Sequence, residues 1–515
     1  MSVSNKANVG LGRGLNVSKY LCYVVASVVF VRILQYGWVT DDAFITFRSV
    51  LNFVNGDGAV FNIGERVQSY THPLWFMLLS VGGLLDLNLY FISIILGLGF
   101  SLLTLMVLFR IHRAVGSQNN DLLLLIALGV LGASESFVSF ATSGLENSAT
   151  YFLVSMVVLS LVDRFRRFWF YFFVSLAILN RFDNIFILTP LVCVIAYSDI
   201  RLARFRFFTA AFAFLPLVAW HITSLIYYGF LFPNTKYAKV GGRTLMENAI
   251  SGMDYLLDSV QSEWHVWMLI ATLPLISFYA LQKRMISNDF RIVFAAVVAG
   301  IYLHVVYVLL VAGGDFMRGR FFTVALLFAV VALLFVKLEV KVWKQVLTVV
   351  VCAVAFTNAA WIGAKEYCLW PMSVTNERNY YKAQLGLNLD PQQNYTMHPW
   401  AVKALSLGNA PRLVGVVGQR GYWMPRQTYL LDRVGLTDAF VARLKIKDHS
   451  RTGHFQRDIP EEYLSKKIKG ISVPEWKDKS AQELSNKLFI VTESPDLFSE
   501  ERFRNMYWLW RSYGI

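Results

Sequence analysis

The chain has 515 residues, of which 56% are hydrophobic, and its formal net charge at pH 7 is +14. A composition this apolar excludes an ordinary soluble protein and favours a chain with many transmembrane helices. The basic residues lie in short loops and not in an arm interleaved with aromatic residues, which argues against nucleic-acid binding. Cys22, Cys193 and Cys352, three of the four cysteines, lie in apolar segments, so the sequence supports neither a disulfide framework nor a zinc site.

Eleven apolar segments are predicted to form membrane-spanning helices. In chain order they cover residues 20–38, 89–110, 121–141, 145–162, 168–181, 184–198, 207–228, 264–282, 291–312, 321–337 and 345–363. No small-residue cleavage site accompanies the first segment, so we expect a retained helix rather than a signal peptide. A twelfth apolar segment, 73–85, is short for a span of about 20 residues. We expect it to lie at the membrane interface, as does the amphipathic stretch 44–54.

The loop charges predict the orientation of the helices. If 73–85 does not cross, the loops on one side carry 17 Lys and Arg residues and the short loops on the other side carry 8. Counting 73–85 as a span destroys this bias. Because cytoplasmic loops are enriched in Lys and Arg, the first loop, 39–88, is predicted to face the periplasm or the cell exterior.

The fold class predicted from these patterns is an all-α polytopic membrane protein with a small C-terminal extracytoplasmic domain. Residues 1–363 form the membrane domain and residues 364–515 form the tail domain, which is less apolar. Alternating residues at 413–417 and the apolar stretch 489–491 favour strands, so we expect the tail to be mixed α/β. No internal repeat is visible, which weakens the case for a transporter built from inverted repeats.

The adjacent acids Asp41 and Asp42 are the strongest candidates for catalysis. They stand where the first membrane helix ends, and a carboxylate pair provides the general base that takes a proton from a sugar hydroxyl. Mutual repulsion is expected to raise one of the two pKa values. The plain alternative is that the acids only mark a helix end.

Basic residues predicted on the same side of the membrane as Asp41 and Asp42 are candidates for binding a lipid phosphate. Arg and Lys supply hydrogen-bond donors and positive charge to phosphate oxygens. They are Arg181, Lys236, Lys239, Arg318 and Arg320. Arg181 is equally well explained by an ion pair with Asp183, and the two lysines by simple solvation. Candidates for binding the rest of the substrate are Arg48, His72, Glu146, Asp183, Asn234, Asp315, Glu377 and Arg378. His72 has the alternative of being an ordinary interfacial residue.

These motifs, in this order, resemble one branch of the GT-C membrane glycosyltransferases. Within this branch the chain resembles the terminal arabinofuranosyltransferases of mycobacterial cell walls and a related pilin arabinosyltransferase of pseudomonads. The resemblance rests on residues 41–48, 56–58, 60–67, 142–146, 233–239, 313–317, 376–381 and 432–438. There are departures: His72-Pro73 replaces the usual Asn or Ser, Phe182 stands where Pro is common, and the tail is shorter than in the mycobacterial enzymes.

The resemblance implies a polyprenyl-phosphate-dependent glycosyltransferase (EC 2.4 class) that inverts the anomeric carbon. It implies that Asp41 or Asp42 is the base and that Arg181, Lys239 and Arg320 are candidates for the donor phosphate. The sugar is expected to be arabinofuranose, and the acceptor a pilin-like protein or a surface glycan of the cell envelope. The short tail argues against a polymeric arabinan acceptor.

The expected location is a bacterial inner membrane, with the active site on the periplasmic face. No cofactor is firmly implied, although the Asp41–Asp42 pair leaves room for a divalent cation. The competing hypothesis is a transporter or flippase of lipid-linked sugars. It would need charged residues deep inside the spans, whereas Arg32, the main charge within a span, lies near a helix end. A membrane protein without catalysis would leave the clustered acids unexplained.

Overall fold

The computed structural model describes residues 17–116, 121–202, 206–337, 374–379, 408–448 and 452–513. Within this part of the chain, six helices are long and apolar enough to cross a membrane. They are α1 (Val17–Gln35), α4 (Leu89–Ala114), α9 (Asn184–Arg201), α10 (Phe207–Tyr228), α13 (Trp264–Gln282) and the unit from Asn288 to Ala312, made of η1 (Asn288–Phe290), α14 (Arg291–Tyr307) and the π-helical turn η2 (Val308–Ala312). The chain is therefore a multi-pass helical membrane protein, as predicted.

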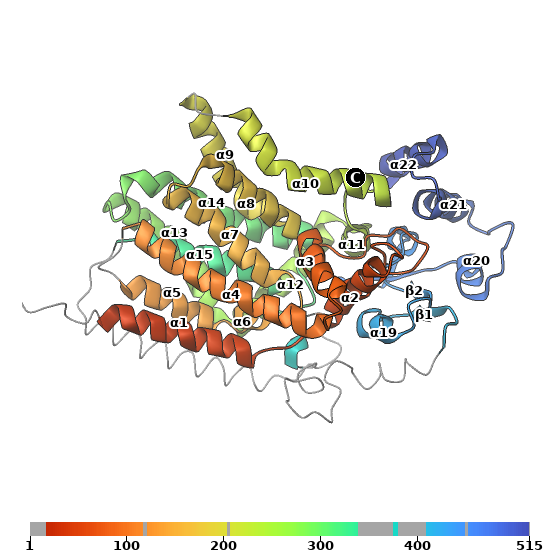
Figure 1. The fold of residues 1–515 in the computed structure, drawn as a ribbon, viewed down its shortest axis with the longest axis horizontal. Coiled ribbons are helices and arrows are strands. Elements are labelled where there is room, and N and C mark those ends of the chain that lie inside the picture. The colour runs from red at the N-terminus through yellow and green to blue at the C-terminus, as the bar shows by residue number, and fades with distance from the viewer. Residues whose placement is uncertain are drawn as a thin grey trace, which may run out of the picture.

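Shorter apolar helices complete the bundle (Figure 1). They are α5 (Asp121–Ala133), α7 (Asn147–Val162), α8 (Arg167–Asn180) and α15 (Thr323–Leu334), the last preceded by the 3₁₀ turn η3 (Arg320–Phe322). The predicted segment 121–141 is two helices and not one, because the Ser134 side chain caps α6 (Glu135–Phe140) by accepting the Phe137 N–H. The last predicted span, 345–363, lies outside the described residues.

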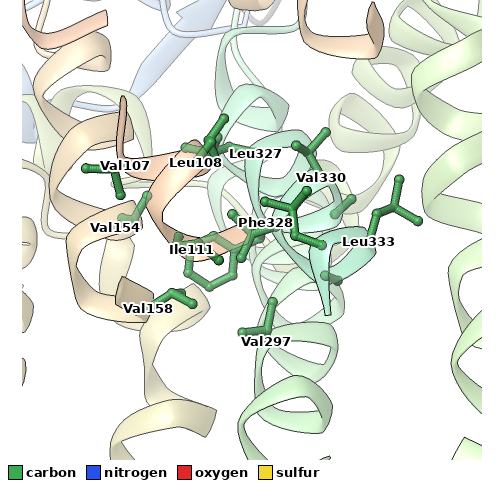
Figure 2. Packing of buried hydrophobic residues seen from close by; sticks show 14 of the residues in the cluster. Val107, Leu108, Ile111, Val154, Val158, Val297, Leu327, Phe328, Val330 and Leu333 are labelled. Carbon is green, nitrogen blue, oxygen red and sulfur yellow. The ribbon is translucent and has the colours of Figure 1, made fainter. Parts of the chain in front are cut away.

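Helix α15 lies at the centre of the bundle, and every one of its residues is buried. Figure 2 shows Leu327, Phe328, Val330 and Leu333 of this helix packed among side chains from α4, α7 and α14. Helix α15 carries apolar side chains on all its faces. Burial on every side therefore removes apolar surface from water without desolvating charged side chains, and the sequence of α15 suits this position.

The first loop folds into two short helices that do not extend the bundle. Helix α2 (Asp41–Val54) begins three residues before the predicted amphipathic stretch. Both acids lie in its first turn, where a negative charge interacts favourably with the helix dipole. Helix α3 (Pro73–Leu84) forms within the apolar segment 73–85, and its location at the membrane interface stays a prediction. It is only 12 residues long and starts with a proline, which is favoured at the first helical position.

The sequence analysis missed two helices between residues 229 and 263. Helix α12 (Leu245–Ser262) follows the short helix α11 (Asn234–Lys239), and its N-terminus is fixed by a capping box between Thr244 and Glu247. The Thr-x-x-Glu pattern is a local signal that could have located this helix.

The tail is mixed α/β, as predicted. Strand β1 (Arg412–Val414) pairs in parallel with β2 (Leu430–Asp432), and β3 (Ile446–Asp448) pairs antiparallel with β4 (Gln456–Arg457). In the described residues of the tail, the helical elements are α19 (Gly418–Trp423), η4 (Val441–Arg443), α20 (Glu461–Leu464), η5 (Ser465–Lys469), α21 (Lys479–Glu493) and α22 (Glu500–Tyr513). The prediction of a strand at 489–491 was wrong, because these residues lie in α21. The buried apolar residues of this helix, Leu484, Leu488 and Val491, recur at helical spacing and belong to one apolar cluster.

The tail packs against the first loop and α11, which lie between it and the bundle (Figure 1). Ile45, Phe61 and Tyr237 share one buried apolar cluster with tail residues such as Leu430 and Val441. The tail therefore completes its core with residues from the membrane domain. The boundary predicted at 363/364 lies outside the described residues and stays a prediction.

Candidate active site

A cavity of about 360 Å³ lies where α2, α11, the 181–186 turn and the 311–321 segment meet. Leu436, Thr452 and Gly453 of the tail border it as well. Eight of the predicted site residues line it: Asp42, His72, Arg181, Asp183, Lys236, Lys239, Asp315 and Arg320. The structure therefore gathers polar residues from five separate stretches of sequence at one end of the bundle.

The opposite end of the bundle carries a different set of charges. Arg110 pairs with Asp163 at the C-terminal ends of α4 and α7. Arg167 pairs with Asp199 near the end of α9. The loops that the charge pattern assigned to opposite faces thus lie at opposite ends of the helices.

Asp42 faces the cavity and lies close to Lys239. The Nζ atom of Lys239 is 3.9 Å from Oδ2 of Asp42 and 4.0 Å from Oδ1 of Asp315. Side chains of Asp42 and Lys239 are 20% and 25% exposed, whereas Asp315 is 2% exposed. One ammonium group thus separates two carboxylates on the cavity wall.

Asp41 does not line the cavity. Its carboxylate accepts the backbone N–H groups of Gly418 (3.2 Å) and Gln419 (2.9 Å) at the start of α19. Burial raises the pKa of the Asp41 carboxyl to about 7; the Asp42 charge adds to the rise, and the two N–H donors oppose it. The expected rise of one pKa in the pair is found at Asp41, with burial as its main cause.

Glu146, which caps α7, is buried beneath the cavity and binds three cationic or basic groups. Its Oε1 accepts from Arg181 at 2.9 Å and from Arg320 at 3.1 Å, and its Oε2 is 3.0 Å from His72 Nδ1. Burial alone would raise the pKa of Glu146, but Arg320, His72 and Arg181 together hold it well below its ordinary value. Glu146 therefore organises the cavity floor without reaching the cavity.

Arg181 is fully engaged by acids. Its Nε and Nη2 atoms donate to the two oxygens of Asp183 at 2.8 and 2.6 Å, and its Nη1 donates to Glu146. Burial would raise the pKa of Asp183, but the Arg181 charge outweighs burial and lowers it. The structure thus contains the Arg181–Asp183 ion pair that was one of the two explanations for these residues.

Arg320 is held more loosely. Besides Glu146, its guanidinium contacts Asn147 Oδ1 at 3.4 Å and Asp315 Oδ2 at 3.6 Å. Such long contacts are weak hydrogen bonds at most. Arg320 can therefore turn toward a new anion at lower cost than Arg181.

Lys236 and Lys239 lie on the same short helix, α11. The Lys236 ammonium lies 3.7 Å from the centre of the Phe232 ring, and burial lowers the pKa of Lys236. Desolvated cations of this kind gain from an anionic ligand, because little water has to be displaced from them.

The remaining cavity wall is largely apolar. Phe182, Phe186 and Phe232 line it together with Val311 and Tyr307. Phe182 is 39% exposed and Val311 is 45% exposed. The cavity thus combines a charged floor with apolar walls that continue onto the outer surface of the helices.

Five predicted site residues lie elsewhere. Arg48 is buried and donates to the backbone carbonyls of Phe61, Gly421, Arg426 and Thr428, so it fastens the tail to the first loop. Asn234 similarly donates to carbonyls of Gly435, Leu436 and Asp438.

The other three lie near the ends of α1 and α12. Arg318 forms a two-point ion pair with Asp258, outside the cavity. Glu377 accepts from Thr40 at 2.5 Å, and Arg378 covers the Tyr36 ring at 3.6 Å. These contacts are within the protein and leave the residues outside the cavity wall.

Two features of the site were missed by the sequence analysis. Thr46 Oγ1 lies 2.8 Å from His72 Nε2 and so fixes the imidazole from the side opposite Glu146. Thr452 and Gly453 of the tail border the cavity next to Lys239, and no local pattern marks them. In the described ranges, no group of three or more His, Cys, Asp or Glu side chains is arranged to hold a metal ion.

Comparisons with known proteins agree with the resemblance predicted from the motifs. The chain is 31% identical over 245 residues to the terminal β-(1→2)-arabinofuranosyltransferase of Mycobacterium tuberculosis, which is 44% of this chain and 39% of that protein. It is 33% identical over 132 residues to the enzyme of the same name from Corynebacterium glutamicum, 24% of this chain and 18% of that protein. The matched segments thus span about two fifths and one fifth of these relatives. The predicted likeness to terminal arabinofuranosyltransferases is confirmed over this part of the chain.

No family model matches the chain. Among solved structures, the crystal structure of ArnT from Cupriavidus metallidurans bound to undecaprenyl phosphate aligns with a TM-score of 0.48 and 15% sequence identity. The alignment covers 84% of this chain and 77% of that one.

Proposed function

We propose that the protein is an inverting glycosyltransferase that moves a sugar from a polyprenyl-phosphate donor to a hydroxyl group of an acceptor. The observation that carries this proposal is the cavity, in which the Asp42 carboxylate lies beside a cluster of cations at one end of a membrane bundle. A base and a phosphate-binding surface are the two parts that such a transfer requires.

Asp42 is the proposed base, because it lines the cavity whereas Asp41 binds the tail backbone. Asp42 takes the proton of the acceptor hydroxyl as the oxygen attacks the anomeric carbon. The bond between that carbon and the phosphate oxygen breaks on the opposite face, and its electron pair leaves with the polyprenyl phosphate. Attack opposite the leaving group inverts the configuration.

Lys236, Lys239 and Arg320 are the proposed partners of the donor phosphate, and Arg181 shapes the floor with Asp183 and Glu146. Cations that are already in place stabilise the charge developing on the phosphate without reorganising. The apolar wall formed by residues such as Phe182 and Phe186 is the proposed contact for the prenyl chain.

The proposed sugar is arabinofuranose, supported by the names of the two partly matching relatives. The proposed acceptor is a pilin-like protein or a surface glycan. The loop charges favour catalysis on the periplasmic face of a bacterial inner membrane. A divalent cation is not needed for the proposed steps.

The test is transfer of radiolabelled sugar from polyprenyl-phosphoryl arabinofuranose to acceptor, in membranes with matched amounts of wild type, Asp42→Asn and Asp41→Asn. Transfer by wild type and its loss in Asp42→Asn support the proposal. If wild type transfers neither arabinofuranose nor hexose while lipid-linked sugar still crosses the bilayer, the flippase hypothesis replaces it.

A further inference from the structure

Lys239 lies between Asp42 and Asp315 and is not in hydrogen-bond contact with either carboxylate. Both N–O distances, 3.9 and 4.0 Å, exceed hydrogen-bond length, so the ammonium neutralises two acids without bonding closely to either. A cation held in this way by charge alone can be drawn to a stronger anionic partner.

Asp315 also leaves bonding capacity unused. Its Oδ1 accepts the N–H of Phe316 at 2.9 Å, whereas its buried Oδ2 has no hydrogen-bond donor and only the Arg320 guanidinium at 3.6 Å. Buried carboxylate oxygens usually accept a hydrogen bond, so Oδ2 of Asp315 can accept a closer one from a cation of the cavity wall.

The stem of Lys239 is confined to this position by its surroundings. Its ammonium lies 5.2 Å from the centre of the Phe316 ring, and a Cβ atom added at Gly453 of the tail would lie 3.6 Å from its Cδ and Cε atoms. Lys236, one turn earlier on α11, instead meets the Phe232 ring. The two lysines therefore differ in position: the Lys239 ammonium lies beside the proposed base, and the Lys236 ammonium lies over the Phe232 ring.

We propose that Lys239 is the counter-ion of Asp42 until the donor phosphate binds, and that the phosphate draws the ammonium away and leaves Asp42 free to accept the acceptor proton. This inference rests on the proposed function and adds to it an order of events. The base becomes available once a donor is in place. Asp315 holds the ammonium within reach of both positions.

The inference predicts that Asp42 and a lipid phosphate compete for the same ammonium. Removing the Asp42 charge should therefore strengthen phosphate binding, and it should do so through Lys239. A double-mutant cycle separates this effect from direct repulsion between Asp42 and the phosphate, which does not require Lys239.

The experiment measures the Kd of decaprenyl phosphate for the purified full-length protein in detergent. The four proteins are wild type, Asp42→Asn, Lys239→Met and the double variant. We expect Asp42→Asn to lower the Kd by about three- to tenfold, and we expect the same substitution in the Lys239→Met protein to change it by less than about twofold. An unchanged Kd in Asp42→Asn, or an equal gain in both backgrounds, would overturn the inference.

Lys236→Met is the matched control, because it removes a lysine from the same helix. In this background the gain caused by Asp42→Asn should persist, although the Kd itself rises. Loss of the gain here too would show a general charge effect and overturn the inference. Thermal unfolding of each variant verifies that it is folded.

The binding cycle needs no turnover, so its failure is distinct from failure of the proposed function. A wild type that transfers sugar but lacks the coupling contradicts only the role of Lys239. A wild type that shows the coupling but transfers no sugar contradicts only the proposed reaction. A wild type that does not bind decaprenyl phosphate contradicts both.

Discussion

Asp41 and Asp42 are adjacent in sequence, yet their carboxylates serve different parts of the molecule. Asp41 accepts two backbone N–H groups from the tail helix α19, whereas Asp42 lies on the cavity wall beside Lys239. The pair is therefore one anchoring acid and one acid that faces the proposed substrates.

This division predicts different activities for two isosteric variants. Asp42→Asn should lower sugar transfer by about 10²- to 10⁴-fold, the usual contribution of a general base. Asp41→Asn should keep most of the activity, because its amide oxygen still accepts one N–H bond. The assay compares initial rates at equal protein amounts. The opposite ranking would assign the base to Asp41.

Asp41 should also make stability depend on pH. Its pKa is about 7 in the folded protein against an ordinary 3.8, so between these values the folded state binds more protons than the unfolded state. The stabilisation is fully present below about pH 4 and is lost as the pH rises through about 7. Glu65 and Asp432, whose pKa values burial raises to about 7, act in the same direction.

The measurement is therefore a difference between two proteins. The thermal midpoint of wild type minus that of Asp41→Asn should fall as the pH is raised from 4 to 7, because the other acids contribute equally to both. A flat or rising difference contradicts the assigned burial of Asp41.

Glu146→Gln should destabilise the protein strongly. The substitution leaves Arg181 and Arg320 without their shared buried carboxylate, and breaking a buried ion pair costs about 3–5 kcal/mol. Asp289→Asn is the control, since its partner Arg164 is exposed and such pairs contribute about 0–1 kcal/mol. Thermal unfolding in detergent measures both. Similar midpoints for the two variants would argue against the organising role of Glu146.

Arg48→Met should loosen the tail. Arg48 donates to carbonyls on both sides of the contact between the first loop and the tail, and its loss leaves several buried acceptors without a donor. We expect trypsin to cleave the tail at least about tenfold faster, as cleavage follows the opened population. Arg504→Met, at an exposed pair with Glu500, should leave the rate unchanged. Equal rates in the two variants would contradict the fastening role.

Substitutions of Arg318 and of Lys236 should change the KM for the donor by different amounts. Lys236 lines the cavity, whereas Arg318 is paired with Asp258 outside it. Lys236→Met should raise the KM for the donor by about tenfold, the weight of one charged contact of about 1.4 kcal/mol. Arg318→Met should change it by less than about twofold. A large rise for Arg318→Met would restore its predicted contact with phosphate.

The sequence by itself determined the apolar helices of the bundle, the short helix α3 and most of the polar residues that line the cavity. In lipid, each helix must satisfy its own backbone hydrogen bonds and present apolar side chains, so the signal is local and appears as a run of hydrophobic residues. The loop charges likewise predict that Asp42, Arg181 and Lys239 lie on the same side of the membrane.

Only the tertiary structure decided which of these residues act together. Neighbouring residues of an α-helix point about 100° apart, so Asp41 and Asp42 had to diverge, but their partners lie far away in the chain at Gly418 and Lys239. Arg48, Asn234 and Arg318 met carbonyls or acids that no local pattern reveals. Charge and hydropathy are properties of a segment, whereas a site depends on contacts between distant segments, and those form only when the chain packs.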